Sequence, residues 1–401
     1  MKRRQRVMDA LNFKETDRVP MDLGGMLSTS VSCFVYSSLR KELGLPEGYP
    51  MIYDEYQMLA IPEADVLDAL DCDVVFVDRN YSNAFNVKNK FEYYDFNGRL
   101  PALVNDKSKY KVLDDGTIIN GKAKMPPTSS VFESEHAGQI FDINNLHKRS
   151  LIEMEKELKS KVITNRKAEE IALLCRNARE STDRAIFLNS YELFLDFVVL
   201  GGIANGSMLC LLEPDYVKEA HGLITEYTVK TLEKLMPYVK ENVDIVLTGN
   251  CDMGTQNSTM VAPDILNELL IKYFKYANDT VHKIAPNVKT FLHSCGAIYS
   301  IMDYIIDANF DILNPVQWSA GEQSYMDWKD KARNKITLWG GGVDSQHVLP
   351  FGKISDVEKQ VEQVVTYMKQ DGGYVFNNIH NITADIDPKK IIAMYKIAKH
   401  V

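Results

Sequence analysis

A histidine and a cysteine lie two residues apart in the segment His293-Ser294-Cys295-Gly296. The segment follows an apolar, strand-like run at residues 288–292, and side chains two positions apart on an extended chain point to the same side. Imidazole nitrogen and thiolate sulfur are zinc ligands, but a protein zinc site needs more than two of them. The spacing therefore predicts part of a metal site, whose remaining ligands must come from elsewhere in the chain.

The composition is typical of a soluble globular enzyme. Of the 401 residues, 45% are hydrophobic and 25% are charged. The formal net charge of -9 disfavours nucleic acid or an anionic membrane as the main partner. No apolar run is long enough to cross a bilayer, and no apolar signal region follows the basic start, so we expect a cytoplasmic protein. The six cysteines form no C-x-x-C pair, and we expect reduced thiols.

The elements that must position the histidine and cysteine follow a regular alternation. Short runs rich in Val, Ile, Leu and Phe alternate with longer helical patterns, and most runs are continuously apolar, as in parallel strands buried on both faces. Eight such units predict an α/β fold of the (β/α)8 TIM-barrel type, with a doubly wound open sheet as the alternative. The predicted strands cover residues 18–23, 73–78, 185–189, 243–248, 288–293, 310–314, 336–339 and 374–379.

One segment, residues 82–148, interrupts this alternation. It is polar, aromatic and turn-rich, and the sequences DFNG at 95–98 and DDG at 114–116 predict hairpin turns. Loops above the carboxyl end of a barrel usually shape its site. We therefore expect a lid or cap inserted after the second strand, within a single barrel domain spanning residues 1–401. A surface insertion without a role in the site is the alternative.

Chemistry in a barrel belongs at the carboxyl ends of its strands. Here nearly every predicted strand ends in a group that can bind metal, carry a proton or hold a polar substrate. These residues are Asp22, Asp78, Tyr191, Cys251, Asp252, His293, Cys295, Asn314, Gln317, Asp344 and His380. Two histidines, two cysteines and four aspartates at these ends predict an enzyme rather than a structural protein.

Several motifs resemble the uroporphyrinogen decarboxylase superfamily, which includes cobalamin-dependent methyltransferases. They are Arg6-Val7-Met8-Asp9-Ala10-Leu11 leading to Asp17-Arg18-Val19-Pro20, then Leu313-Asn314-Pro315-Val316-Gln317, Gly340-Gly341-Gly342-Val343-Asp344 and Gly372-Gly373-Tyr374. The resemblance implies a TIM-type barrel and extends over the chain outside the insertion.

The decarboxylase branch of the superfamily has an arginine-rich loop after the first strand, which grips the substrate carboxylates. The corresponding loop here, residues 24–30, contains no arginine, the residue that provides bidentate contacts to carboxylates. Asp78 matches the aspartate that this branch uses to hold pyrrole NH groups, and it equally fits a polar strand end. A decarboxylase of a tetrapyrrole or another carboxylated ring therefore stays the alternative.

The methyltransferase branch of the superfamily has an H-x-C motif after the fifth strand and a further cysteine after the eighth strand. In that branch these three residues hold zinc, and the present chain resembles it at this point. His293 and Cys295 match the pair, and His380 takes the third position. The resemblance implies these three residues as zinc ligands, with Cys251 or Asp252 as an additional candidate. The alternatives are a substrate-binding or acid–base role for His380, and a metal-free histidine beside a buried thiol.

The resemblance thus implies a zinc-dependent methyltransferase. It would move a methyl group between a small substrate, such as a methoxyarene (O-demethylation) or a thiol, and the cobalt of a corrinoid (methylcobalamin). The expected catalytic carboxylates are Asp252, Asp344 and Asp78, and the expected substrate contacts are Asp22, Tyr191, Asn314 and Gln317.

We expect the corrinoid to be carried by a separate partner protein. Corrinoid proteins resemble one another in D-x-H-x-x-G, and the nearest sequence here, Asp344-Ser345-Gln346-His347, has the wrong spacing. The superfamily resemblance also implies a homodimer. A catalytically silent binder of a corrinoid protein is the non-enzymatic alternative.

Overall fold

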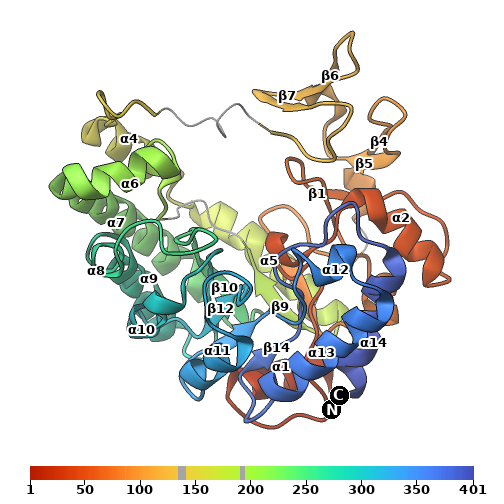
Figure 1. Ribbon diagram of the computed structural model, residues 1–401. Helices are drawn as coiled ribbons and strands as arrows, with labels where there is room; N and C mark the ends of the chain where they lie inside the picture. The colour runs from red at the N-terminus through yellow and green to blue at the C-terminus, as the bar shows by residue number, and fades with distance from the viewer. Residues whose placement is uncertain (86, 134–140, 190–194) are drawn as a thin grey trace.

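The computed structural model describes residues 1–85, 87–133, 141–189 and 195–401. Its central element is a parallel sheet with strand order β14-β13-β12-β11-β10-β9-β3, surrounded by helices (Figure 1). The strands are mostly apolar and buried because both of their faces are covered. They are β3 (Val74–Val77), β9 (Ala185–Leu188), β10 (Ile245–Asn250), β11 (Lys289–His293), β12 (Ile312–Asn314), β13 (Thr337–Trp339) and β14 (Tyr374–Val375).

The segment 20–22 closes this sheet into a barrel. The backbone N–H of Phe376, just after β14, donates to the carbonyl of Pro20, and the N–H of Asp73, just before β3, donates to the carbonyl of Met21. The first and last strands of the sheet are therefore joined through this segment. The predicted (β/α)8 barrel is confirmed, and each of the eight predicted strands contributes to it.

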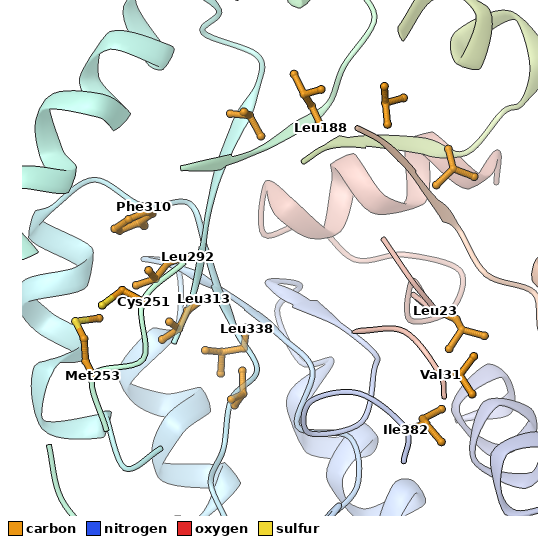
Figure 2. Close-up of a cluster of buried hydrophobic side chains, with 14 of the residues drawn as sticks. Leu23, Val31, Leu188, Cys251, Met253, Leu292, Phe310, Leu313, Leu338 and Ile382 are labelled. Atoms are coloured by element: carbon orange, nitrogen blue, oxygen red, sulfur yellow. The ribbon is translucent and has the colours of Figure 1, made fainter. Parts of the chain in front are cut away.

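Two hydrophobic layers hold the barrel together. The inner layer includes Phe187, Phe291 and Trp339 from three strands, together with Val7 and Leu11 of α1, which covers the amino-terminal end of the barrel. The outer layer lies between strands and helices, where the side chains of neighbouring strands lie side by side (Figure 2). Inner and outer side chains alternate along each strand, as the pleat requires.

The helices follow the strands in sequence and cover the outer face of the sheet. The longest, α7, has 26 residues. The helices are α1 (Arg3–Leu11), α2 (Cys33–Glu42), α3 (Ala64–Ala69), α4 (Leu151–Lys161), α5 (Asn165–Ser181), α6 (Ile203–Leu212), α7 (Pro214–Val239), α8 (Pro263–Leu266), α9 (Lys272–Ile284), α10 (Met302–Asp307), α11 (Tyr325–Ala332), α12 (Val348–Phe351), α13 (Ile354–Met368) and α14 (Pro388–His400). In the described part of the chain, no helix is both long and apolar enough to cross a membrane.

The insertion forms two small antiparallel sheets that stand apart from the barrel (Figure 1). Both predicted turns are present: one joins β4 to β5, with Asn97 and Gly98 at positive φ, and the other joins β6 to β7. A further hairpin pairs β1 (Ile52–Asp54) with β2 (Leu59–Ala60). The strands of the insertion are β4 (Glu92–Tyr94), β5 (Ala102–Val104), β6 (Tyr110–Val112), β7 (Ile118–Asn120) and β8 (Ala123–Met125).

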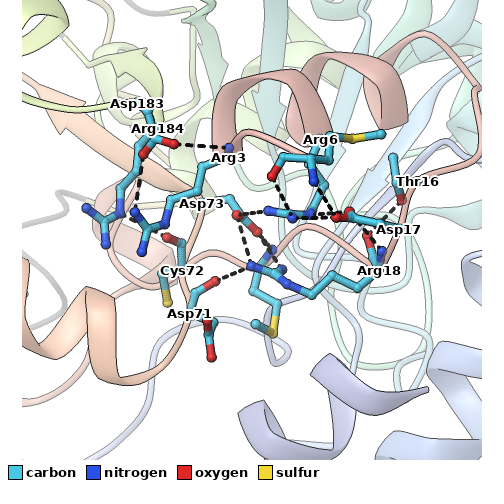
Figure 3. Close-up of polar contacts among 12 residues, drawn as sticks. Arg3, Arg6, Thr16, Asp17, Arg18, Asp71, Cys72, Asp73, Asp183 and Arg184 are labelled. Carbon is cyan, nitrogen blue, oxygen red and sulfur yellow. Dashed lines mark hydrogen bonds and ion pairs between the residues drawn. The ribbon is translucent and has the colours of Figure 1, made fainter.

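An ion-pair cluster occupies the amino-terminal end of the barrel (Figure 3). Asp73 is fully buried and accepts hydrogen bonds from Arg6 Nη1 at 2.7 Å, Arg18 Nη1 at 2.7 Å and the N–H of Met21 at 2.9 Å. Arg6 also reaches Asp17 through Nε at 2.7 Å. The amino-terminal motif that carries the family resemblance is therefore structural, because it lies at the end of the barrel opposite to the carboxyl ends of the strands.

Candidate functional site

Three predicted metal ligands meet at the carboxyl end of the barrel. His293 is the last residue of β11, Cys295 lies two positions further, and His380 lies in the loop after β14. One ligand atom from each lies within 4.8 Å of the others, and Cys295 Sγ is 3.3 Å from His293 Nε2. The three residues could hold a metal ion and leave a fourth position open, the pattern of catalytic zinc sites.

Asn314 sets the orientation and tautomer of His293. The amide nitrogen of Asn314 donates to the carbonyl of Trp339 at 2.9 Å, so its Oδ1 faces His293 Nδ1 at 2.6 Å as an acceptor. Nδ1 must then carry the imidazole proton, which leaves the lone pair on Nε2, directed toward Cys295. A second residue that fixes the ring in this way is usual behind a metal-ligating histidine.

Burial keeps two of the ligand side chains, those of Cys295 and His380, neutral. It raises the pKa of the Cys295 thiol well above its ordinary value, and the neighbouring Asp252 carboxylate raises it further. Burial, with a smaller effect of His293, lowers the pKa of His380 to about 4, so its imidazole is unprotonated at neutral pH. A thiol of this kind ionises when a metal cation binds it.

Two glycines allow the loops after β10 and β11 to touch. Gly296 has a φ of 92°, and a Cβ atom there would lie 2.3 Å from the backbone carbon of Gly254. The N–H of Gly254 donates to the carbonyl of Cys295 at 3.1 Å. Direct backbone contact therefore fixes Cys295 relative to β10, and any side chain at position 296 would separate the loops.

Asp252 lies beside the metal-ligand cluster. Its Oδ1 accepts from the N–H of Cys295 at 2.9 Å and lies 3.9 Å from His293 Nε2, while 45% of its side chain is exposed. Its neighbour Cys251 is 3% exposed and packs in the hydrophobic core near Met253 (Figure 2). The Cys251 sulfur is not among the ligand atoms that meet in the cluster of described residues.

A cavity of about 840 Å³ opens in front of the cluster. Its walls come from the loop after the first strand, the β1–β2 hairpin, and the loops after β3, β9 and β10. The described lining residues are Met26, Leu27, Ser28, Tyr53, Asp54, Glu55, Tyr56, Gln57, Asp78, Arg79, Asn80, Tyr81, Asn105, Asn189, Asp196, Phe197, Val198, Ile203, Leu247, Asn250, Cys251, Asp252, His293 and His380.

Five of the predicted site residues in the described part of the chain are not among the lining residues. One is Cys295, which belongs to the metal-ligand cluster, and each of the other four has a structural contact instead. Asp22 is fully buried, accepts from Trp339 Nε1 at 2.9 Å, and has its pKa raised to about 6 by that burial. Gln317 Oε1 accepts from the N–H of Gly296 at 2.8 Å. Asp344 accepts from the N–H of Gln346 and contacts His347, and Asn314 lies behind His293. Tyr191 lies outside the described residues.

Sequence reasoning missed the β1–β2 wall of the cavity. Tyr53, Asp54 and Glu55 come from a short hairpin between the first and second barrel strands, which carries no strong strand pattern. Arg79 and Tyr81 lie one and three residues after the predicted Asp78. Counting the three residues after this strand end as candidate site residues would have included both. Asp196 lies beyond β9 in a segment without a periodic signal.

One family comparison and one structural comparison agree with this architecture. The family model described as uroporphyrinogen decarboxylase (URO-D) matches residues 198–401. A solved structure described as a methyltransferase from Methanosarcina mazei is 12% identical, with 100% of this chain and 99% of that chain covered at a TM-score of 0.56. The Ignisphaera aggregans GH53 catalytic domain is 12% identical over 65% of this chain and 91% of its own, at a TM-score of 0.33. No curated protein sequence matches the chain.

Proposed function

The chain belongs to the uroporphyrinogen decarboxylase family, and within this family we propose that it is a zinc-dependent methyltransferase. It moves a methyl group between a small substrate, such as a methoxyarene or a thiol, and the cobalt of a corrinoid carried by a partner protein. The observation that carries the proposal is the meeting of His293, Cys295 and His380 at a cavity.

The donor set fits zinc. Nitrogen and sulfur ligands are those that zinc prefers, and three of them with an open position suit a reaction rather than a purely structural role. Asn314 accepts from His293 Nδ1, which leaves Nε2 as the ring nitrogen available to the metal. When bound, zinc supplies Lewis acidity that stabilises negative charge on the heteroatom that loses or receives the methyl group.

The chain's own residues hold the reactants in place. In demethylation, the heteroatom would keep the electron pair of its broken bond to the methyl carbon. The reduced cobalt, Co(I), of the partner's corrinoid would supply the pair for the new bond to that carbon. Asp252 keeps the loop of Cys295 in place through its hydrogen bond to the Cys295 N–H. The cavity walls position the substrate in front of the cluster, and the partner protein brings the cobalt to the open side.

The insertion, residues 82–148, acts as a lid in this proposal. Its support is the position of Asn105 in the cavity lining. The insertion also packs on the segment before β1: the N–H of Leu103 in β5 donates to the carbonyl of Pro50 at 2.8 Å. The β1–β2 hairpin, which supplies one cavity wall, is thereby connected to the insertion.

Decarboxylation of a polycarboxylated tetrapyrrole fits the cavity less well. Such a substrate needs several cationic partners, and Arg79 is the only lysine or arginine among the described lining residues. Five lining residues are themselves aspartate or glutamate, which repel carboxylates. The family name by itself does not assign the reaction, because one fold supports many reactions.

Metal analysis of three purified proteins tests the proposal. We expect about one zinc per chain in the unmodified protein purified without chelators, and its loss in Cys295→Ala. Cys251→Ala is the matched control: it removes a thiol from the neighbouring strand end, outside the ligand cluster, and should keep its zinc.

The proposal fails if the unmodified protein contains no zinc. If zinc is present, methyl transfer to a corrinoid protein is then measured with methoxyarenes and methyl thioethers. Zinc binding without any turnover would favour the silent corrinoid-protein binder, and metal-free release of carbon dioxide would favour the decarboxylase.

A further inference from the structure

The described cavity lining is strongly acidic. It contains five carboxylates and one guanidinium, from Asp54, Glu55, Asp78, Asp196, Asp252 and Arg79. A concave, partly buried surface of one charge sign concentrates ligands of the opposite sign. The binding site is the cavity beside the metal ligands, and the carboxylates determine the charge of that cavity.

Cations balance only part of this negative charge: Arg79 and Lys90 act electrostatically on Asp78. Glu55 also pairs with a lysine, at 2.8 Å from Lys109 Nζ. Asp78 uses Oδ1 to accept from two backbone N–H groups, those of Asn80 and Tyr81, at 2.6 and 2.8 Å. Burial raises the pKa of the Asp78 carboxyl, and these backbone hydrogen bonds, with the charges of Arg79 and Lys90, offset part of that rise.

A metal ion on the cluster does not balance the charge. A divalent ion bound to the Cys295 thiolate adds one net positive charge, and the carboxylate beside it is Asp252. The carboxylates of Asp54 and Asp78 belong to a different part of the lining, formed by the β1–β2 hairpin and the loop after β3. That wall remains negative when the metal site is filled.

Aromatic rings accompany the carboxylates of this wall. The Tyr53 ring stacks on Phe76 with centroids 4.2 Å apart, and the Tyr81 ring lies edge-on to Tyr53 at 6.2 Å. Burial and the charge of Asp78 raise the pKa of both phenols well above the ordinary value, so both remain neutral. Neutral aromatic faces beside carboxylates are a favourable environment for organic cations.

We propose that the substrate carries a positively charged ammonium group, which binds the wall formed by Tyr53, Asp54, Asp78 and Tyr81. Its methyl-bearing heteroatom lies at the other end, in front of His293 and Cys295. This inference rests on the proposed methyltransferase function and names its substrate class. The acidic wall also disfavours anionic analogues of the same size, because the described lining holds five carboxylates and one guanidinium.

Calorimetric titration with two probes of equal shape tests the charge preference. Choline carries a quaternary ammonium, and 3,3-dimethylbutan-1-ol is its neutral carbon isostere. We expect choline to bind at least about tenfold more tightly at low salt, and the preference to shrink as salt rises. Asp78→Asn should reduce the preference several-fold, as should Tyr81→Leu, while Glu180→Gln on the exposed face of α5 should leave it unchanged.

Equal binding of the two probes, or no choline binding up to about 10 mM, overturns the inference. Equal losses in Asp78→Asn and Glu180→Gln overturn it as well, because the effect would then be one of overall charge. The titration needs no corrinoid protein, so its outcome is separate from that of the methyl-transfer assay. Selective choline binding without any methyl transfer would contradict the methyltransferase and leave the charge preference intact.

Discussion

A single amide determines which nitrogen of His293 is available to a ligand. Asn314 lies directly beside His293 in the parallel register of β11 and β12, and its two hydrogen bonds leave it one possible orientation. The sequence predicted Asn314 as a substrate contact because it ends a strand. Which residue lies behind the histidine depends on strand register, and a single sequence does not reveal it.

Asn314→Ala should weaken zinc binding. The substitution leaves the buried His293 Nδ1–H without an acceptor and frees the ring to turn, so we expect about a 10- to 100-fold loss of affinity. Competition with a chromophoric chelator measures it. Asn314→Asp restores an acceptor and should recover part of the loss; equal losses in the two variants would show that Asn314 matters for packing alone.

Asp22 makes the stability of the barrel depend on pH. Its folded pKa of about 6 lies above the ordinary 3.8 because the carboxyl is fully buried. Between these values the folded state holds more protons than the unfolded state, so this group's contribution to stability decreases as pH rises from about 4 to 6 and is constant above. The total decrease is on the order of 3 kcal/mol.

Asp22→Asn should remove that decrease. Urea denaturation gives the free energy of unfolding of both proteins at pH 4.5 and pH 7.5. The difference between the two proteins at each pH isolates Asp22, because the contributions of the other titrating groups cancel. We expect the variant to become more stable relative to the unmodified protein as the pH rises. Parallel pH profiles of the two proteins would exclude this role for Asp22.

At the scale of elements, the sequence predicted the hairpins of the insertion but not the β1–β2 hairpin. The hairpins of the insertion were predicted because Asn97 and Gly98 are turn-forming residues with local signals. The β1–β2 hairpin was missed because its strands have three and two residues, too few to show a period. The pair His293 and Cys295 was likewise predicted from a local signal, their spacing of two residues after a strand. The β1–β2 wall of the cavity has no such signal, because its position depends on tertiary contacts.

The ion-pair cluster under the barrel should contribute strongly to stability. Asp73→Ala leaves Arg6 and Arg18 with side chains only 7% and 12% exposed and without their shared partner. Removing one member of a buried pair costs about 3–5 kcal/mol in the free energy of unfolding.

Urea denaturation measures this cost, with Asp183→Ala as the control. Asp183 pairs with Arg3 at an exposed position, so its loss should cost less than about 1 kcal/mol. Zinc content should be unchanged in both variants because the cluster lies at the opposite end of the barrel from His293. A loss of zinc in a folded Asp73→Ala protein would contradict this separation of structural and functional ends.

At the scale of the whole molecule, the barrel was predictable because repeated strand–helix units have few ways to pack. All eight strand predictions fall on barrel segments, including 20–22, which forms only a single bridge pair to β14. The cavity was predictable only in part. Asp78, Asp252, His293 and His380 line it from predicted strand ends, whereas its β1–β2 wall comes from a part of the chain outside the repeat.

A chain that stops after residue 372 should fail to form a stable barrel. It lacks β14 and α14, so the segment 20–22 loses one partner and β13 becomes an open edge. We expect loss of cooperative unfolding by circular dichroism and aggregation by size-exclusion chromatography. Residues 373–401 supplied as a separate polypeptide should restore cooperative unfolding; a truncated chain that unfolds cooperatively alone would show that closure is dispensable.

Closure of the barrel through segment 20–22 has a consequence for the order of events on the ribosome. Phe376 is synthesised 355 residues after Met21 (376 − 21), so Pro20 and Met21 leave the exit tunnel long before their partner is made. Contacts between residues so distant along the chain form slowly. The nascent barrel therefore exposes an unpaired strand edge throughout elongation, which is the state that chaperones protect from aggregation.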